Sequence, residues 1–351
     1  MSGVQTITLD IEADGVRLDR WVRRIFPHVG QGRIEKLCRK GEIRVDGGRV
    51  KASTRLVTGQ TIRIPPLPDA TADDTRRHDR PAATITDAQA EMIRAAVIYR
   101  DDDLIALNKP PGLAVQGGSG TTVHVDMLSD ALKFGADTKP KLVHRLDKDT
   151  SGILLLARSG RAAAALTKSF QARTTRKIYW AAVAGMPNPR AGTIRYGLVK
   201  SAGHGPHGAG EKMICIHPDR VTEHPGAKRA TSDFMVLEGL AQRAAWVALV
   251  PVTGRTHQLR AHMAEIGNPI VGDGKYGTNA QENLGDGWGA QLGGAISRKL
   301  HLHARAITID HPSSGARLNL TAPLPEHMAR TWEFFGWQAG DHAGDPFEDD
   351  E

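Results

Sequence analysis

The chain has 351 residues, and its 46 Lys plus Arg outnumber its 39 Asp plus Glu, which leaves a formal net charge of +7. This length exceeds one average domain, and the basic balance favours a polyanionic partner such as nucleic acid. The sequence has only two cysteines, which argues against a disulfide framework. It has no secretory leader pattern and no apolar run of the ~20 residues that span a bilayer, which argues against a secreted protein and a membrane partner. We therefore expect a cytoplasmic location.

Residues 1–66 have the pattern of two short helices followed by a small sheet. Apolar residues recur at helical spacing over 18–25 and again over 34–38. Residues 46–48 form a hairpin turn, and the alternating segment 61–64 closes the sheet. These 66 residues contain 13 Lys plus Arg and 7 Asp plus Glu. This excess of positive charge favours phosphate contacts with a nucleic acid, which supply affinity more than sequence choice; the alternative is a charged face without a partner.

The rest of the chain divides into a linker, a large domain and a tail. Residues 67–92 are rich in Pro, Ala, Thr, Asp and Arg without apolar periodicity, which predicts a linker. Over 93–335, strand patterns are separated by hairpins as often as by helices, which predicts an α+β fold with a mixed, mostly antiparallel sheet. Within it, 201–226 is rich in Gly, His and Pro and predicts a surface loop. Residues 336–351 are predicted to be an acidic disordered tail.

The segment His144–Gly152 is a loop of basic, acidic and hydroxyl side chains that runs directly into the apolar strand 153–157. On local composition alone, its two aspartates are ordinary turn residues that bond to nearby backbone amides. Its letters, H-R-L-D-K-D-T-S-G, are however similar to the H-R-L-D-x-x-T-S-G signature of the RluA/RluC/RluD family of pseudouridine synthases. That resemblance implies that Asp147 is the catalytic residue.

Further motifs of the same family follow in the same order. G-R-T-H-Q-L-R at 254–260 and G-D-G-K-Y-G at 272–277 resemble the family's G-R-T-H-Q-[IL]-R and G-D-x-x-Y-G. Shorter matches are N-K-P-x-G from Asn108, K-x-Y from Lys177 and L-H-A from Leu302. The first 66 residues resemble the S4-type RNA-binding domain, with R-L-D at its first helix and G-x-I-x-V-[ND]-G after its second.

The subfamily most similar to this chain is the RluC type, which acts on 23S ribosomal RNA. The segments 62–66 and 114–120 carry this likeness, although Gln116 stands where the pattern has His. The resemblance implies isomerisation of uridine to pseudouridine, in which the N-glycosidic bond breaks and a C–C bond forms. No cofactor and no metal is required, and the sequence has neither a dinucleotide-binding Gly fingerprint nor a P-loop.

The expected catalytic set is Asp147, Tyr179 and Arg255. A carboxylate can attack the sugar or the base, or stabilise charge on the ribose, and the sequence leaves this open. Burial raises the pKa of a carboxyl group, so a fixed cation must keep it charged, and motif position assigns this part to Arg255. A structural ion pair or phosphate contact is the alternative for Arg255. Tyr179 is expected to stack on the uracil, the alternative being core packing.

The target nucleotide must leave its stack to reach a buried carboxylate. Arg145 is the candidate to stack in the place that the extruded base has left, or else to bind a phosphate. The histidines at 144, 257, 262, 301 and 303 lack the spacing of a zinc site, and His257 is expected to orient the Arg255 loop. The other residues expected to contact RNA are Lys109, Lys177, Arg17, Arg20, Arg39 and Lys40.

The first hypothesis is therefore a ribosomal RNA pseudouridine synthase with an S4-type domain. The alternative is a non-catalytic RNA-binding or ribosome-assembly factor on the same scaffold. A third hypothesis, a nucleoside or sugar hydrolase using Asp147 and Asp149, does not account for the basic N-terminal unit.

Overall fold

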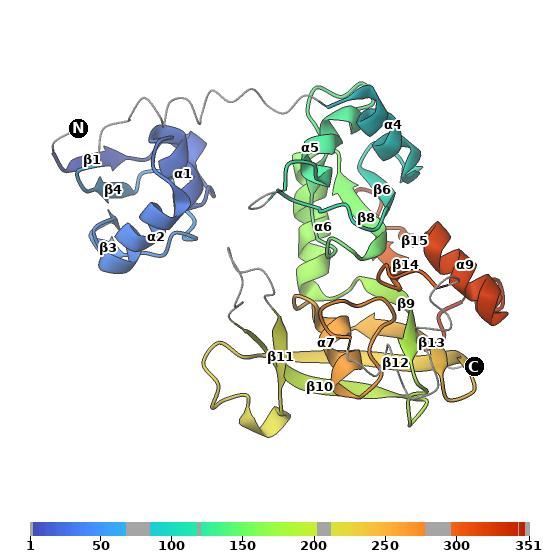
Figure 1. Ribbon diagram of the computed structural model, residues 1–351. Coiled ribbons are helices and arrows are strands. Elements are labelled where there is room, and N and C mark those ends of the chain that lie inside the picture. The colour runs from blue at the N-terminus through green and yellow to red at the C-terminus, as the bar shows by residue number, and fades with distance from the viewer. Residues whose placement is uncertain are drawn as a thin grey trace. The chain divides into compact units, whose positions relative to one another are not determined.

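The computed structural model describes residues 3–67, 85–117, 121–201, 212–277, 296–342 and 344–347. The chain divides into two compact units, residues 1–84 and 85–351 (Figure 1). Within the described ranges, every helix is too short or too polar to cross a bilayer.

The N-terminal unit packs two helices against a four-stranded antiparallel sheet of order β1-β4-β2-β3. Its core joins helix residues such as Leu18, Trp21 and Leu37 to the sheet residues Ile62 and Ile64. The predicted helices and sheet are confirmed, and the edge strand β1 is an addition to them. The elements are β1 Gln5–Thr8, the 3-10 turn η1 Ile11–Ala13, α1 Leu18–Ile25, α2 Gln31–Lys40, β2 Arg44–Val45, β3 Gly48–Arg49 and β4 Thr61–Ile64.

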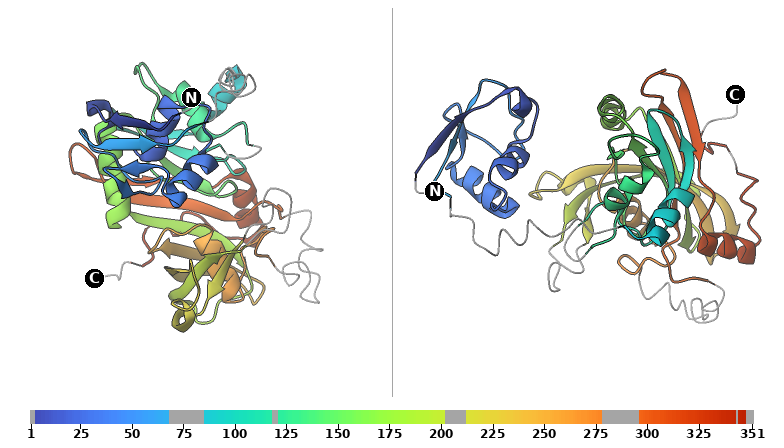
Figure 2. Two further views of the ribbon diagram at one scale, coloured as in Figure 1. Left: turned by 90° about the vertical axis from the view of Figure 1, so that its left-hand side faces the viewer. Right: turned by 90° about the horizontal axis from the view of Figure 1, so that it is seen from above.

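The second unit is built on an eleven-stranded sheet of order β11-β10-β12-β13-β9-β14-β8-β6-β5, with β15 paired to β14 and β7 to β8. Every pairing is antiparallel except that of β14 with β8, so the predicted mostly antiparallel α+β fold is confirmed. The sheet twists strongly along its length (Figure 2). Its strands are β5 Val97–Arg100, β6 Leu104–Lys109, β7 Lys141–Leu142, β8 Ser151–Ala157, β9 Arg176–Ala184, β10 Ala191–Lys200, β11 Met213–Ile216, β12 Lys228–Leu240, β13 Ala244–Pro251, β14 Leu302–Asp310 and β15 Arg317–Thr321.

Helices cover both faces of this sheet because its strands alternate apolar side chains between the two faces. In β13, Trp246 packs with the cluster that contains Trp332 of α9, whereas Val247 packs with the cluster that contains Met263 of α7. At the other end of the sheet, α4 and α5 pack on one face and α6 on the other. The helices are α4 Asp87–Ala95, α5 Val125–Leu128, α6 Gly160–Ala172, α7 Gln258–Glu265 and α9 Glu326–Phe335, with 3-10 turns η2 Ser129–Leu132 and η4 Pro218–Arg220.

The parallel contact between β14 and β8 lies where the signature loop enters the sheet. Ser151 pairs with His303 and Gly152 with Ala304. Gly152 has φ +103°, and a Cβ there would lie 2.3 Å from the carbonyl oxygen of Ala304. Only glycine fits this position, which explains the last letter of the H-R-L-D-K-D-T-S-G run. The loop before Gly152 is thereby fixed at the middle of the sheet.

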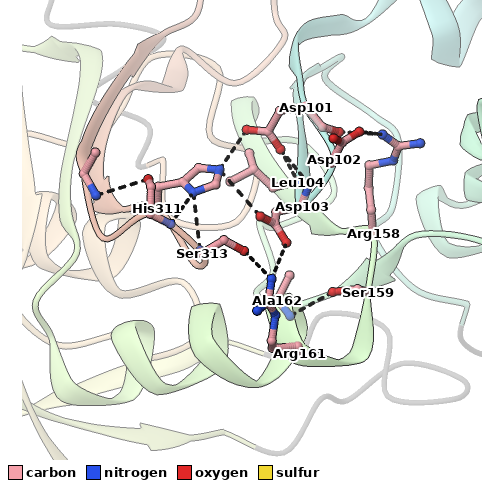
Figure 3. Close-up of polar contacts among 12 residues, drawn as sticks. Asp101, Asp102, Asp103, Leu104, Arg158, Ser159, Arg161, Ala162, His311 and Ser313 are labelled. Atoms are coloured by element: carbon pink, nitrogen blue, oxygen red, sulfur yellow. Dashed lines mark hydrogen bonds and ion pairs between the residues drawn. The ribbon is translucent and has the colours of Figure 1, made fainter.

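The acidic turn of the β5–β6 hairpin is tied to two other parts of the unit (Figure 3). His311, which follows β14, lies 3.0 Å from the Oδ2 atom of Asp101. Arg158 and Arg161, at the start of α6, lie 3.8 Å from Asp102 and 3.9 Å from Asp103. These three aspartates therefore fasten the hairpin to the β14–β15 turn and to α6.

Three predicted boundaries are corrected by the structure. The linker was expected to reach residue 92, but 87–95 form α4, whose Ile93 is fully buried; residues 68–84 lie outside the described residues. The stretch 201–226 was expected to be a loop, but 213–216 form β11, which pairs with β10; residues 202–211 are not among those described.

The third correction concerns the C-terminal segment, expected to be disordered from residue 336. Trp337 is 5% exposed and packs against Trp332, and Asp345 forms a two-pronged pair with Arg176 at 2.7 and 3.0 Å. Local acidity predicts solvation, but a distant cation and an apolar cluster hold the described residues of this segment, 336–342 and 344–347. Residues 343 and 348–351 lie outside the description.

Candidate active site

A cavity of about 680 Å³ opens where the signature loop meets β9 and the turn before α7. The loop contributes residues 144–148 and 150, β9 contributes Lys177 and Tyr179, and the turn and α7 contribute residues 253–260. Asp147, Tyr179, Arg145, Lys177 and Arg255 thus line one cavity, as the sequence predicts for a common site.

Asp147 lies on the wall of this cavity beside two basic side chains. Its side chain is 28% exposed, and its Oδ2 atom is 3.9 Å from Nη1 of Arg260 and 3.9 Å from Nε2 of His257. Two backbone hydrogen bonds hold the loop around this residue: the Thr150 amide donates to the Asp147 carbonyl, and the Gly112 amide donates to the Lys148 carbonyl. The carboxylate is therefore presented to the cavity by a fixed backbone.

Arg260 is locked in place by Asp273, the aspartate of the G-D-G-K-Y-G motif. Nε and Nη2 of Arg260 donate to the two carboxylate oxygens of Asp273, each at 2.7 Å. Although burial alone would raise it, the pKa of Asp273 is lowered by Arg260 and by the amides of Lys275 and Tyr276. This geometry fixes a permanent cation whose third nitrogen, Nη1, is directed to Asp147.

The second basic neighbour, His257, is held by the same motif. Its backbone is left-handed, with φ +51°, and its Nδ1 atom is 3.0 Å from the hydroxyl of Tyr276. That hydroxyl also accepts the Met213 amide at 2.8 Å, so its proton is available to Nδ1 of His257. Burial lowers the pKa of His257 and so favours the neutral ring, which then carries its proton on Nε2, facing Asp147.

The cation beside Asp147 is therefore Arg260, and the assignment of Arg255 to this part is wrong. Arg255 lies in the turn before α7, where Nε donates to the carbonyl of Arg229 in β12 at 3.2 Å. Arg260 lies in the first turn of α7, and the packing of that helix buries its side chain. Both arginines belong to one motif, so their spacing could not show which of them turns inward.

The sequence interpretation also missed His257, Asp273 and Tyr276 as parts of the site. All three were within the quoted motifs, but their contacts with Asp147 or Arg260 arise from the meeting of separate loops. His257 does not orient Arg255; Gln258 does this by accepting its backbone amide at 3.1 Å.

Tyr179 lies on β9 and packs against the apolar clusters of both halves of the sheet. In the strand register it is opposite Leu249 of β13 and Ala304 of β14. Burial raises the pKa of its hydroxyl, and the nearby charge of Asp147 raises it further, so the phenol stays protonated at neutral pH. Among the described residues nothing bonds to that hydroxyl. An aromatic face and a free hydroxyl are therefore available in the cavity next to Asp147.

Lys109, expected to contact RNA, is instead fully buried. Its Nζ atom donates to the carbonyls of Pro110, Leu113 and Lys148, each at 2.9 Å. Burial lowers its pKa to about 7, against the opposing charges of Asp149 and Asp147. Lys109 thus joins the N-K-P-P-G loop to the signature loop and has no donor left for RNA.

Replacing Lys109 by Met should destabilise the protein, because three buried carbonyls would lose their donor. We expect a loss of about 2–5 kcal/mol in the free energy of unfolding, measured with urea. Lys148→Met is the matched control, since its exposed side chain serves none of these carbonyls, and its change should stay within about 0.5 kcal/mol. Equal effects of the two substitutions would contradict this structural role.

The remaining residues expected to contact RNA differ in availability. Lys177 and exposed Arg145 line the cavity; burial and the charge of Arg173 lower the pKa of Lys177. In the N-terminal unit, Arg17 is engaged by buried Asp19 through Nε at 3.1 Å and Nη2 at 2.6 Å, so its main contact is internal. The exposed set is Arg20, Arg39 and Lys40, the last 3.6 Å from Glu42.

His301, just before β14, and His303, on β14, are fully buried and serve the core. Nε2 of His301 is 2.8 Å from the Thr331 hydroxyl, and Nδ1 of His303 is 2.9 Å from that of Ser151. In the part of the chain that the structure describes, no group of three or more His, Cys, Asp or Glu is placed to hold a metal ion.

Comparison with known families agrees with the motifs and the fold. Residues 103–265 match the RNA pseudouridylate synthase family, and residues 16–62 match the S4 domain. Two solved human structures are similar. RNA Pseudouridylate Synthase Domain Containing 4 has a TM-score of 0.55 and 27% identity, covering 71% of this chain and 96% of that one. RNA Pseudouridylate Synthase Domain Containing 1 has a TM-score of 0.50 and 25% identity, covering 66% and 83%.

Similar sequences extend over almost the whole chain. Ribosomal large subunit pseudouridine synthase C of Vibrio cholerae is 35% identical over 325 residues, which cover 93% of this chain and 95% of the relative. The protein of the same name from Rickettsia bellii is 35% identical over 330 residues, covering 90% and 96%. The chain therefore belongs to the RNA pseudouridylate synthase family and carries an S4 domain in its N-terminal unit.

Proposed function

We propose that this protein converts specific uridines of large-subunit ribosomal RNA to pseudouridine, with Asp147 as the catalytic residue. The observation that carries the proposal is the placement of the Asp147 carboxylate in an open cavity, next to the anchored Arg260 and the free hydroxyl of Tyr179. The names of the relatives from Vibrio cholerae and Rickettsia bellii support the large-subunit substrate. Such a substrate places the enzyme in the cytoplasm.

The chemistry needs an ionised carboxylate facing a nucleotide that has left its stack. The bond between N1 of uracil and C1′ of ribose breaks, the base turns, and C5 bonds to C1′; the C5 proton is lost and N1 gains one. Arg260 places a fixed positive charge 3.9 Å from the Oδ2 atom of Asp147, where it attracts the carboxylate. The ring of Tyr179 stacks on the uracil, and its protonated hydroxyl takes up the C5 proton while it passes its own proton to water.

Basic side chains around the cavity and on the N-terminal unit hold the RNA. Arg145 is exposed at the cavity wall and either replaces the extruded base in its stack or clamps a phosphate. Lys177 adds a cation inside the cavity. On the N-terminal unit, Arg20, Arg39 and Lys40 make phosphate contacts, which raise affinity without choosing the sequence.

Mapping pseudouridine in ribosomal RNA from cells with and without this protein tests the proposal. We expect a small number of large-subunit positions to lose the modification without the protein and to regain it when the gene is returned. The Asp147→Asn variant should fail to restore them. An unchanged map would favour the non-catalytic RNA-binding alternative, whereas changes confined to small-subunit RNA would contradict the substrate.

A further inference from the structure

The side chain of His144 fills a gap in the edge of β8. On this edge β8 pairs with β14 at Ser151 and Gly152, and with β7 at Leu156 and Ala157. Within the described part of the chain, no strand pairs on this edge with the residues between these two short pairings. The amide of Leu155 donates instead to Nε2 of His144 at 2.9 Å. The imidazole thus replaces a strand partner and anchors the start of the catalytic loop to the sheet.

This hydrogen bond determines where the ring carries its proton. Nε2 accepts the Leu155 amide, so a neutral imidazole must hold its hydrogen on Nδ1. Burial, with a smaller contribution from the charge of Lys177, lowers the pKa of His144 to about 3, so the ring is neutral at physiological pH. The ring also stacks on Phe170, with centroids 4.4 Å apart and planes 28° from parallel, which fixes its orientation.

The Nδ1–H group of His144 remains available as a donor to a ligand in the cavity. His144 is one of the residues that line the cavity, together with Asp147 and Lys177. Across the described ranges no protein atom accepts a hydrogen bond from Nδ1, and Nδ1 is not among the buried side-chain atoms that lack a partner. A donor whose position and protonation are both fixed by the backbone therefore faces the space that the nucleotide must enter.

We infer that His144 is a positioning residue whose Nδ1–H donates a hydrogen bond to a carbonyl oxygen of the extruded uracil. The inference rests on the proposed function, because it needs a uridine in the cavity. A neutral donor suits a neutral carbonyl acceptor, whereas the charged side chains of Arg145 and Lys177 suit phosphate. One hydrogen bond of this kind would hold the base while its glycosidic bond is exchanged.

Two substitutions of His144 test the roles of its two ring nitrogen atoms separately. In His144→Gln the amide oxygen can still accept the Leu155 amide, but no donor remains near the position of Nδ1. In His144→Asn the amide nitrogen can take the position of Nδ1, but the shorter side chain does not reach the Leu155 amide. Thermal unfolding and single-turnover pseudouridine formation on one RNA fragment are measured for both variants.

We expect His144→Gln to unfold close to the parent temperature and to lose about tenfold in kcat/KM, the size of one hydrogen bond. His144→Asn should unfold at a lower temperature and, when assayed well below it, keep more activity than His144→Gln. A purely structural histidine predicts the reverse order, with His144→Gln active and His144→Asn impaired. That order would overturn the inference.

RNA with 2-thiouridine or 4-thiouridine at the target identifies the acceptor, because sulfur accepts hydrogen bonds poorly. One of the two thio substitutions should slow the parent protein, and on that RNA the parent and His144→Gln should react at similar rates. A full tenfold difference on both thio RNAs would show that neither uracil carbonyl is the acceptor and would overturn the carbonyl assignment. An inactive parent protein would instead refute the proposed function, and this inference with it.

Discussion

Asp147→Asn is expected to lower pseudouridine formation by roughly 10³-fold or more, because the amide cannot act as the charged carboxylate. The cavity, the Arg260 anchor and the basic surfaces do not depend on the charge of Asp147, since Arg260 is held by Asp273. Binding of the RNA should therefore stay within a few-fold of the parent protein. The two measurements are single-turnover product formation and titration of a labelled RNA at fixed salt.

Asp149→Asn is the matched control for this substitution. Asp149 is two residues away in the same loop and has the same charge, but it is exposed and does not line the cavity of Asp147. Its activity should remain within about threefold of the parent, as for an ordinary surface substitution. Equal losses for both variants would show that the loop as a whole matters and not the carboxylate of Asp147.

The second large effect is expected at Arg260, and it separates this arginine from Arg255. Arg260→Met leaves the carboxylate of Asp273 buried without its partner, and breaking such a pair costs about 3–5 kcal/mol of stability. Arg255→Met removes one hydrogen bond to a carbonyl of β12 at a partly exposed side chain, and it should cost about 1 kcal/mol or less. Chemical unfolding of both variants measures the difference.

The charge-conserving variants should lose activity in the same order, with the larger loss for Arg260→Lys and the smaller one for Arg255→Lys. Arg260→Lys keeps a charge but cannot hold Asp273 with two prongs while reaching Asp147, so kcat/KM should fall by about 10²-fold. Arg255→Lys should lose less than about tenfold. A larger loss for Arg255→Lys than for Arg260→Lys would indicate that Arg255 is the cation that acts on Asp147, and it would contradict the geometry of the site.

The stability gap between Arg260→Met and the parent should also depend on pH. The folded pKa of Asp273 lies below its ordinary value of 3.8, so the pair contributes fully above that value and is lost as pH falls through the lowered pKa. In the variant, burial without Arg260 raises the pKa of Asp273, and protonation then relieves the buried charge. The gap should therefore shrink as pH falls toward and below 3.8.

Much of the architecture could be predicted from the sequence because it depends on local patterns. Residues 160–172 form a helix for local reasons, since Ser159 caps its first turn and apolar residues recur along one side. The continuous apolar run of β13 is typical of a strand that is buried on both faces. Asp147 and Tyr179 could be placed in one cavity because each lies in a motif with a recognisable neighbour.

What only the tertiary structure decided is which charged side chains turn inward. Lys109 and Arg260 resemble surface residues in sequence, yet both are buried because separate loops supply three carbonyls to one and a carboxylate to the other. The C-terminal segment is likewise ordered by Arg176, far away in the chain. Periodicity records whether a side chain is apolar, whereas the burial of a charge depends on a partner that only the folded chain brings within reach.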